Sequence, residues 1–576
     1  MAVIYLYCIG FVACFYGVGS VLLPNDDKKL PCDVRAQLDS GWVCGSIRPA
    51  EEGVQYASFR GIPYAQQPLG ALRFKELQNL SPWKDVLLAT EEGPICPQYD
   101  ELYGRLVNSA EMSESCILAN VHVPLNISSF GSKSESQDQP KLPILVFIHG
   151  GAFQAGSGNS DVHGPEYLVS KGAIVITFNY RLNVFGYLSL NSTKIPGNNG
   201  LRDAITLLKW VQRNALAFGG DPDNVTLGGH SSGAVNTHLL SLSEASKGLF
   251  KRVILMSGVA NAGFYTASPI YAETVAQMFL GLVGINSTDA DEIHDQLIQM
   301  PLEKIMEGYR VMQFQTAVVA FAAVVESKFD GVTQILDDDP TNLIKQGRGK
   351  DLPMIIGSTS NECETFKRKI TYLNMVKLIE QNPAIVLAPQ ITYTVAPTRA
   401  TELSQTVLDR YFQGNVTIEK YIPCCSDTFF VYPAIKVAEW RASLGGAPAY
   451  RYEFNFDSTF NVAKAGLMLN YEGSGHIEDL TFAFRSNSLM RPNEKSFPPR
   501  TRDDLMKNWM TSIVVNFMRC SKPVCDDEAT WPATDAQQLN YQQISEPVFT
   551  NNNVPLTEAQ RNMFDFHNQV FQSAGI

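Results

Sequence analysis

The sequence predicts an α/β protein with a mostly parallel central sheet that is flanked by helices and carries large insertions. Apolar runs without glycine that end in loops recur along the chain, and such runs are typical of buried parallel strands. Segments with apolar residues at i, i+3, i+4 and i+7 lie between some of them, as in helices with one buried face. This alternation favours a sheet covered on both faces. No internal repeat or linker divides the chain, so residues 20–576 are expected to form one domain.

The individual elements follow from these patterns. In chain order, the predicted strands are 142–148, 173–178, 224–227, 253–256, 354–356 and 450–454. A helix is predicted from Leu201 to Ala217, and its buried face carries Ala204, Leu207, Leu208 and Val211. Later helices are predicted over 504–518 and 558–571. Residues 259–350 have helical character and are expected to form an insertion over the sheet, whereas 128–140 is expected to be a surface loop.

The net charge and the N-terminal sequence indicate which partners and which cellular location to expect. The formal net charge is −12 and no basic block is interleaved with aromatic residues, so nucleic acid is excluded as a partner. Residues 3–18 are apolar, end in small residues and precede the polar segment 25–29. This pattern predicts a secretory signal over residues 1–19 and a secreted protein, with a retained anchor as the alternative because no basic residue precedes the apolar run. No later stretch approaches membrane-spanning length, so no stable membrane insertion is expected.

Glycosylation sequons and cysteines agree with an extracellular location. The candidate sequons are Asn79, Asn126, Asn191, Asn286 and Asn415. A sixth, Asn224, enters a predicted strand and is expected to be too enclosed for modification. Two of the eleven cysteines, Cys8 and Cys14, lie in the predicted signal. Because nine remain, at least one cysteine is free or paired with another molecule.

One motif suggests covalent chemistry. Residues 229–233, Gly-His-Ser-Ser-Gly, form the only G-x-S-x-G in the sequence, and they lie between a predicted strand and the apolar segment 234–240. A strand, a sharp glycine turn and a helix are the setting of a nucleophile elbow, in which the serine sits on a strained turn. Ser231 is therefore the candidate acyl-accepting nucleophile, with chance occurrence of the motif as the alternative.

A serine nucleophile needs a base that takes its proton. His294, His476 and His567 lie far enough downstream for the chain order serine, acid, histidine. His294 is expected on an exposed helix and His567 on the terminal helix. His476 lies in a glycine loop just beyond the last predicted strand, where a catalytic base is expected. His476 is therefore the predicted base.

The acid and the oxyanion donors are predicted in two other loops. The loop after strand 354–356 contains Glu362 and Glu364, and spacing alone does not choose between them. The segment 149–153 directly follows strand 142–148, and its paired glycines let backbone N–H groups approach a ligand closely. The predicted oxyanion donors are the backbone N–H groups of Gly151, Ala152 and Ser232. This chemistry needs no metal and no cofactor.

With several further motifs, the chain resembles the type-B carboxylesterases of the cholinesterase family over nearly all of its mature length. The residues that carry the resemblance are 59–65, 114–121, 149–153, 179–182, 200–203, 218–222, the G-x-S-x-G motif and Gly473-x-x-His476-x-x-Asp479-Leu480. The resemblance implies the α/β-hydrolase fold, with Ser231 as nucleophile and His476 as base. It also implies Glu362 as the acid, five residues after the strand-end glycine, with Cys363 where the family has glycine.

The resemblance also implies scaffold pairs. These are a Cys96–Cys116 disulfide and the ion pairs Arg60–Glu114 and Arg181–Asp203. Cys32 and Cys44 would suit paired strands near the N-terminus. Cys363 is a candidate for the free cysteine, and the cysteines that could pair in several ways are Cys424, Cys425, Cys520 and Cys525.

The predicted function is a secreted serine carboxylesterase that hydrolyses small-molecule carboxylic esters through an acyl-serine intermediate. A catalytically silent adhesion or binding protein of the same fold is the alternative from another class. A cholinesterase is disfavoured because residues 96–116 contain no tryptophan to hold a quaternary ammonium. The chain resembles secreted insect carboxylesterases, which leaves a general, a juvenile hormone or an odorant or pheromone esterase open. His230 argues against a juvenile hormone esterase, because those enzymes usually have Gln at the position before the serine. The acyl and alcohol pockets are expected within 259–350 and 380–470.

Overall fold

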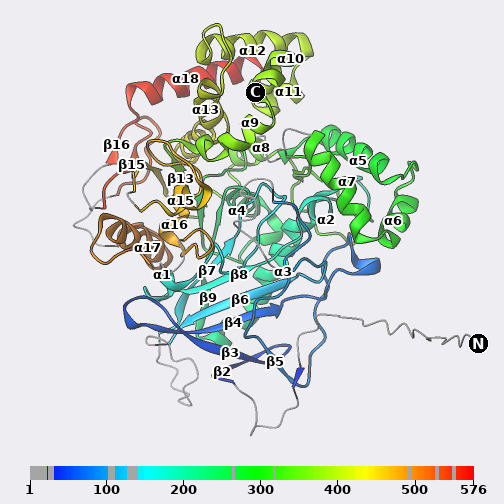
Figure 1. Ribbon diagram of the computed structural model, residues 1–576, viewed down its shortest axis with the longest axis vertical. Helices are drawn as coiled ribbons and strands as arrows, with labels where there is room; N and C mark the ends of the chain where they lie inside the picture. The colour runs from blue at the N-terminus through cyan, green and yellow to red at the C-terminus, as the bar shows by residue number, and fades with distance from the viewer. Residues whose placement is uncertain are drawn as a thin grey trace, which may run out of the picture.

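The computed structural model describes residues 22–23, 32–100, 111–125, 140–262, 266–315, 319–458, 460–490, 496–525, 531–547 and 553–576. The predicted signal over 1–19, Asn126 and most of the predicted loop 128–140 lie outside these residues. Within them, fourteen strands form one large sheet and two short strands form a second. Helices cover the large sheet (Figure 1).

The centre of the large sheet is parallel. The strands that lie side by side here are β8 (Ile174–Phe178), β7 (Leu142–Ile148), β9 (Gly220–His230), β10 (Arg252–Met256), β13 (Met354–Thr359), β14 (Ala449–Phe454) and β15 (Tyr541–Ile544). All six predicted strands are among them, and the predicted mostly parallel sheet is confirmed. Five of the six were predicted to within a few residues at each end, whereas β9 begins four residues before the predicted strand and ends three residues after it.

The N-terminal part of the chain extends this sheet with strands that the sequence did not predict. β6 (Leu118–Pro124) pairs antiparallel with β8, β4 (Gln55–Pro63) with β6, and β3 (Gly41–Pro49) with β4. β2 (Val34–Leu38) forms a hairpin with β3 through a two-residue turn. In Figure 1 these strands lie at the end of the molecule opposite the helices α10, α12 and α18.

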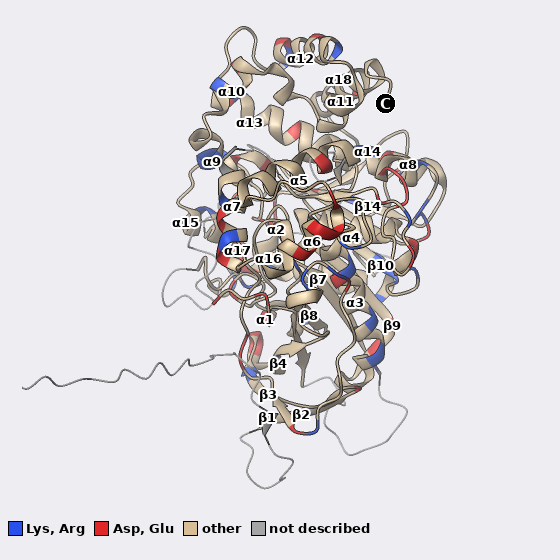
Figure 2. Ribbon diagram, turned by 90° about the vertical axis from the view of Figure 1, so that its right-hand side faces the viewer, with Lys and Arg blue, Asp and Glu red and all other residues tan. Residues whose placement is uncertain are grey.

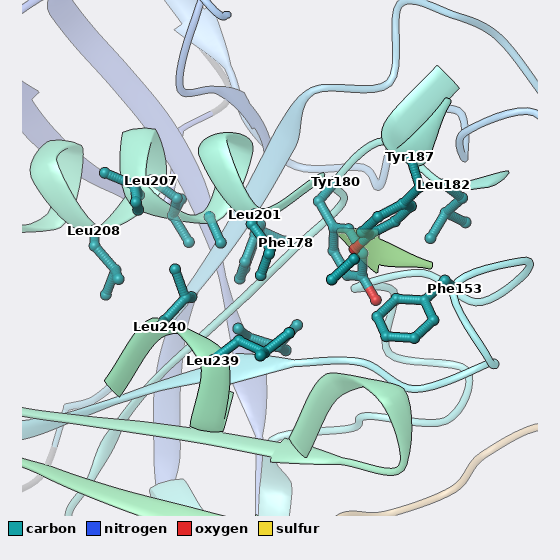
Figure 3. Packing of buried hydrophobic residues seen from close by; sticks show 14 of the residues in the cluster. Phe153, Phe178, Tyr180, Leu182, Tyr187, Leu201, Leu207, Leu208, Leu239 and Leu240 are labelled. Carbon is teal, nitrogen blue, oxygen red and sulfur yellow. The ribbon is translucent and has the colours of Figure 1, made fainter. Parts of the chain in front are cut away.

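Both faces of the parallel strands are buried. In β7, Ile144 and Val146 belong to one apolar cluster, whereas Leu145 and Phe147 belong to another on the opposite face. The first face is covered by α3 (Asn199–Asn214), and the second by α17 (Arg502–Cys520). Figure 3 shows leucines of α3 facing leucines of α4 (Ser232–Leu242) in the first cluster. All seven residues of β7 are buried, which explains why this strand is a continuous apolar run in the sequence.

Two helical insertions lie between strands. The first contains α5 (Pro269–Val283), α6 (Ala290–Gln299), α7 (Leu302–Gln315) and α8 (Pro340–Lys345), which confirms the helical character predicted for 259–350. The second lies between β13 and β14, and its helices are α9 (Lys367–Tyr372), α10 (Met375–Gln381), α11 (Pro389–Thr394), α12 (Pro397–Tyr411), α13 (Ile418–Ser426) and α14 (Tyr432–Leu444). The terminal helix α18 (Glu558–Ser573) lies beside the second insertion (Figure 1).

Three sequence-based expectations are wrong. Cys363 is not free but is bonded to Cys425, while Cys424 is the buried free cysteine of the described residues. Glu114 pairs with Arg73, with 2.6 Å between Oε1 and Nε, and Arg60 instead lies 3.4 Å from the Glu91 carboxylate. His294 is on α6 as expected but is buried, because it lies on the inner face of that helix. In each case the partner is distant in sequence or the burial depends on packing.

The expected Arg181–Asp203 ion pair and the expected disulfides Cys32–Cys44 and Cys96–Cys116 are present in the structure. Arg181 and Asp203 form a buried ion pair, with 2.6 Å between Nη2 and Oδ1. Cys32–Cys44 and Cys96–Cys116 are disulfides, and the remaining pair is Cys520–Cys525. The described candidate sequons Asn79, Asn191, Asn286 and Asn415 are exposed. Asn224 is half-buried, and its side chain accepts a hydrogen bond from Arg252.

The described residues bear on the expectations for membrane segments and for charge. No helix within the described ranges is both long and apolar enough to span a bilayer. On the face shown in Figure 2, acidic and basic residues are interspersed along the helices.

Candidate active site

Ser231 lies at the junction of β9 and α4, as the motif predicts. Its backbone has φ 57° and ψ −128°, a conformation that a residue with a Cβ rarely adopts, and such strain is typical of a nucleophile elbow. Its N–H donates to the carbonyl of Met256, at the end of the neighbouring strand β10, at 2.8 Å. The flanking glycines are required by space, because a Cβ at Gly229 would collide with the backbone of Gly233.

The structure brings His476 and Glu362 together. His476 Nδ1 lies 2.6 Å from Glu362 Oε2, and both side chains are fully buried. Glu362 Oε1 also accepts a hydrogen bond of 2.7 Å from the backbone N–H of Thr359, at the end of β13. His476 Nε2, on the other side of the ring, has no partner among the described residues. Glu364 instead faces Lys367, 3.7 Å away, so the geometry distinguishes the two glutamates.

Burial sets the proton affinities of this pair. It lowers the pKa of His476, because the apolar surroundings disfavour the charged imidazolium. It raises the pKa of Glu362, and the hydrogen bond from the Thr359 N–H acts in the opposite direction. A neutral imidazole at neutral pH has an unprotonated nitrogen, which is the form that a general base needs.

Three aromatic rings surround the His476 imidazole. The ring centroids of His230, Phe366 and Phe430 lie 4.5, 4.9 and 5.0 Å from that of His476. Sequence reasoning gave none of these rings a role at the site. Phe366 follows the acid by four residues and its position could have suggested it. Phe430 comes from the second insertion, and no local pattern indicates its position.

The glycine-rich loop after β7 lies against the elbow. Gly151, Ala152 and Phe153 have φ values of 120°, 55° and 61°, so the loop turns back on itself. The N–H of Phe153 donates to Ser232 Oγ at 3.2 Å, which joins the loop to the start of α4. Within the described residues, the N–H groups of Gly151 and Ala152 have no acceptor. The N–H of Ser232 has no intrahelical acceptor, because it is in the first turn of α4.

A small cavity of about 30 Å³ adjoins the glycine-rich loop. Its lining includes Gly150 and Gly151 of the loop, His230, whose ring packs on His476, and Ile477, the next residue after the base. A buried water needs about 10–15 Å³ of such space, so this cavity holds roughly two water-sized groups. Of the predicted site residues, Gly151 lines this cavity, whereas Ser231, Ser232 and His476 are not among its lining residues.

Comparison with known proteins identifies the protein family to which the chain belongs. The carboxylesterase family model matches residues 33–562 of the chain, and the chain belongs to that family. It is a carboxylic-ester hydrolase with the α/β-hydrolase fold, as the sequence predicts, and the catalytically silent alternative is set aside.

Three relatives within this family show the extent of the similarity. A juvenile hormone esterase of Heliothis virescens is 50% identical over 518 residues, which are 89% of this chain and 90% of that protein. The crystal structure of juvenile hormone esterase from Manduca sexta, with OTFP covalently attached, is 51% identical with a TM-score of 0.89, and covers 94% of this chain and 99% of that one. A para-nitrobenzyl esterase of Bacillus subtilis is 29% identical over 89% of this chain and 96% of its own length. Two of these three relatives are juvenile hormone esterases, and each is about half identical to this chain.

Proposed function

We propose that this protein hydrolyses juvenile hormone, with Ser231 as nucleophile, His476 as base and Glu362 as the acid that orients the base. The observation that carries the catalytic assignment is the 2.6 Å hydrogen bond between the buried Glu362 and His476 side chains, beside a strained serine elbow. The identities of 50% and 51% to two juvenile hormone esterases support the substrate.

The reaction proceeds in two halves. Ser231 Oγ attacks the ester carbonyl carbon while His476 Nε2 takes the hydroxyl proton, and Glu362 stabilises the resulting imidazolium. The carbonyl oxygen becomes an oxyanion that accepts hydrogen bonds from the N–H groups of Gly151, Ala152 and Ser232. The carbon–alkoxy bond then breaks and the imidazolium returns the proton to the alcohol. A water activated by the same histidine attacks the acyl-enzyme, which releases the carboxylic acid and restores Ser231.

The central experiment is hydrolysis of juvenile hormone by the purified mature protein and by its Ser231→Ala variant. We expect conversion to the acid by the parent and a loss of at least about 10³-fold in the variant, because no acyl-enzyme can form. Labelling by a fluorophosphonate should disappear in the same variant. Turnover that survives the substitution would reject Ser231. Turnover of p-nitrophenyl acetate without turnover of the hormone would retain the triad and reject the substrate.

The compartment and the domain structure belong to the same proposal. Removal of residues 1–19 would leave a secreted single domain over 20–576, with N-glycans at Asn79, Asn126, Asn191, Asn286 or Asn415. Exposure of the four described sequons supports this. N-terminal sequencing of the protein recovered from the medium of expressing insect cells should begin near Ser20, and glycosidase treatment should lower its mass. An N-terminus at Met1 in a membrane fraction would favour the anchored alternative.

A further inference from the structure

The residue that follows the proposed catalytic acid is covalently attached to a distant helix. Cys363 comes directly after Glu362, in the short helix η6 (Glu362–Phe366), and is bonded to Cys425 near the end of α13, 62 residues later in the chain. Both cysteines are buried. The segment that presents the acid is thereby fixed to the second insertion.

A second link lies beside the disulfide. Ser426, the residue after Cys425, accepts a hydrogen bond at its Oγ from the backbone N–H of Cys363, at 3.0 Å. The same hydroxyl donates to the carbonyl of Ile422, one turn earlier in α13, at 3.0 Å. Two consecutive residues of α13 thus hold Cys363, the residue that follows Glu362.

The helix then changes its winding. Residues Asp427–Val431 form a π-helical turn between α13 and α14, and such turns occur frequently at functional sites. Phe430 belongs to this turn, and its ring centroid lies 5.0 Å from that of His476. It lies 6.4 Å from the ring of Phe366, which also contacts His476. The helix that holds the acid's neighbour therefore also packs an aromatic ring against the base.

We propose that the Cys363–Cys425 disulfide and the π-turn that follows it form a positioning device for the Glu362–His476 pair. The disulfide fixes the segment of the acid, and Phe430 fixes and shields the imidazole. None of these residues touches the reacting atoms, so they are positioning residues rather than catalytic ones. Misplacement of a catalytic group by about 1 Å can lower turnover about 100-fold, which gives such a device a measurable effect. The proposal rests on the triad assigned under the proposed function.

The first test compares two disulfides in the mature protein. In Cys363→Ala/Cys425→Ala we expect kcat for p-nitrophenyl acetate to fall at least about tenfold with KM within about twofold, because the acid is misplaced while the substrate contacts remain. The matched control is Cys520→Ala/Cys525→Ala, which removes the disulfide at the end of α17 and should leave both constants within about twofold. Cys424→Ala controls for substitution beside Cys425. A fall in melting temperature without a fall in kcat would overturn the proposal.

The second test keeps the disulfide and therefore stands if the first variant does not fold. Phe430→Leu opens part of the imidazole face to water, so we expect a lower kcat and a shift of the acid limb of kcat/KM toward the ordinary histidine value. Phe412→Leu is the matched control, because Phe412 is buried in the same apolar cluster and is not among the rings that surround His476. Equal effects of the two substitutions would reject a positioning role for Phe430.

Failure of this proposal can be separated from failure of the proposed function. Ser231→Ala and Glu362→Gln are assayed in the same series. If these two variants lose turnover while the cysteine and Phe430 variants keep the parental kcat and pH profile, the triad assignment is retained. The positioning role of the disulfide and Phe430 is then rejected. If Ser231→Ala keeps turnover, the triad itself falls, and the positioning device falls with it.

Discussion

Glu362 and Glu364 are two residues apart, yet their environments differ because of how the chain leaves β13. Glu362 begins a short helix and points inward, where it meets both the Thr359 N–H and His476 Nδ1. Glu364 lies on the outer side near Lys367. A carboxylate can hold the imidazole in one tautomer only from the first of these positions.

We predict that Glu362→Gln lowers kcat by about 10³–10⁴-fold with little change in KM, because an amide favours the wrong tautomer and does not stabilise the imidazolium. Glu364→Gln is the matched control and should keep kcat within about twofold. Steady-state kinetics with a p-nitrophenyl ester measures both. A large effect of the Glu364 substitution with none at Glu362 would exchange their roles.

The burial of His476 has a consequence for the pH profile. Its pKa lies below the ordinary value of 6.5, so the imidazole stays neutral to lower pH and can still accept a proton there. We predict that the acid limb of kcat/KM has an apparent pKa below 6.5. The measurement is kcat/KM from pH 4 to 8 at constant ionic strength. Recovery of full activity after return from acid to neutral pH controls for unfolding. An acid limb at or above 6.5 would contradict the prediction.

The sequence predicts some residues of the candidate site but not others. The order serine, acid, histidine selected Ser231 and His476 as candidates, because few histidines lie downstream. Spacing left Glu362 and Glu364 open, and the geometry distinguishes them only through the direction of each side chain. Phe430 could not have been found, because its contact with His476 depends on the path of an insertion whose helices carry no motif.

At the scale of elements, the site depends on two loops at the ends of adjacent parallel strands, β7 and β9. Gly150 is the point of closest approach. A Cβ built there would lie 2.7 Å from the carbonyl oxygen of His230 and 3.0 Å from Ser231 Cβ. The loop therefore reaches the nucleophile only because residue 150 has no side chain.

We predict that Gly150→Ala lowers kcat by about 10²-fold or more, because the loop must move away from Ser231 and carry its N–H donors with it. The control is Gly281→Ala in α5, where an added Cβ meets no atom within 4 Å. That variant should keep full activity. Esterase kinetics and circular dichroism measure the outcome, and a fully active Gly150→Ala would place the oxyanion donors elsewhere.

Strands and helices were predictable from the sequence where a single local pattern determines them. The parallel strands are buried on both faces, so each appears as a continuous apolar run such as residues 142–148. The strands β2, β3, β4 and β6, which pair antiparallel with one another, are less uniformly apolar, as in Val34–Leu38, and their pairing depends on partners elsewhere in the chain. The helices of the second insertion pack largely on one another, and local periodicity did not reveal them.

At the scale of the whole molecule, the disulfides predict the number of free thiols in the mature protein. Four disulfides use eight of the nine cysteines expected in the mature chain, which leaves Cys424. Burial raises the pKa of this thiol to about 12, so it is unreactive in the folded protein. We predict no reaction with a thiol reagent in the native state and one thiol per chain in guanidinium. Cys424→Ala should give none in either condition. Three thiols in guanidinium would mean that one disulfide is absent.

The sheet also joins the two ends of the chain into one structure. β15 pairs with β14, and β16 (Asn553–Val554) pairs with β15 at one edge of the sheet, whose opposite side is formed by strands before residue 90. Beyond β15, α18 packs on α14, with the ring of Phe564 5.7 Å from that of Tyr432. An apolar core on each face of the sheet is shared by segments from distant parts of the chain.

We therefore predict that the mature protein unfolds as one unit. Tryptophans lie near both ends of the chain, at residues 42, 83, 509 and 531 among others, so fluorescence reports on both ends. On heating, fluorescence, far-ultraviolet circular dichroism and esterase activity should lose their signals over the same temperature range. A protein that ends at residue 534 lacks β15 and α18, which exposes the edge of β14 and the apolar face of α14, and it should not accumulate as a soluble, active monomer. Two separate transitions, or an active truncated protein, would show that the chain contains more than one folding unit.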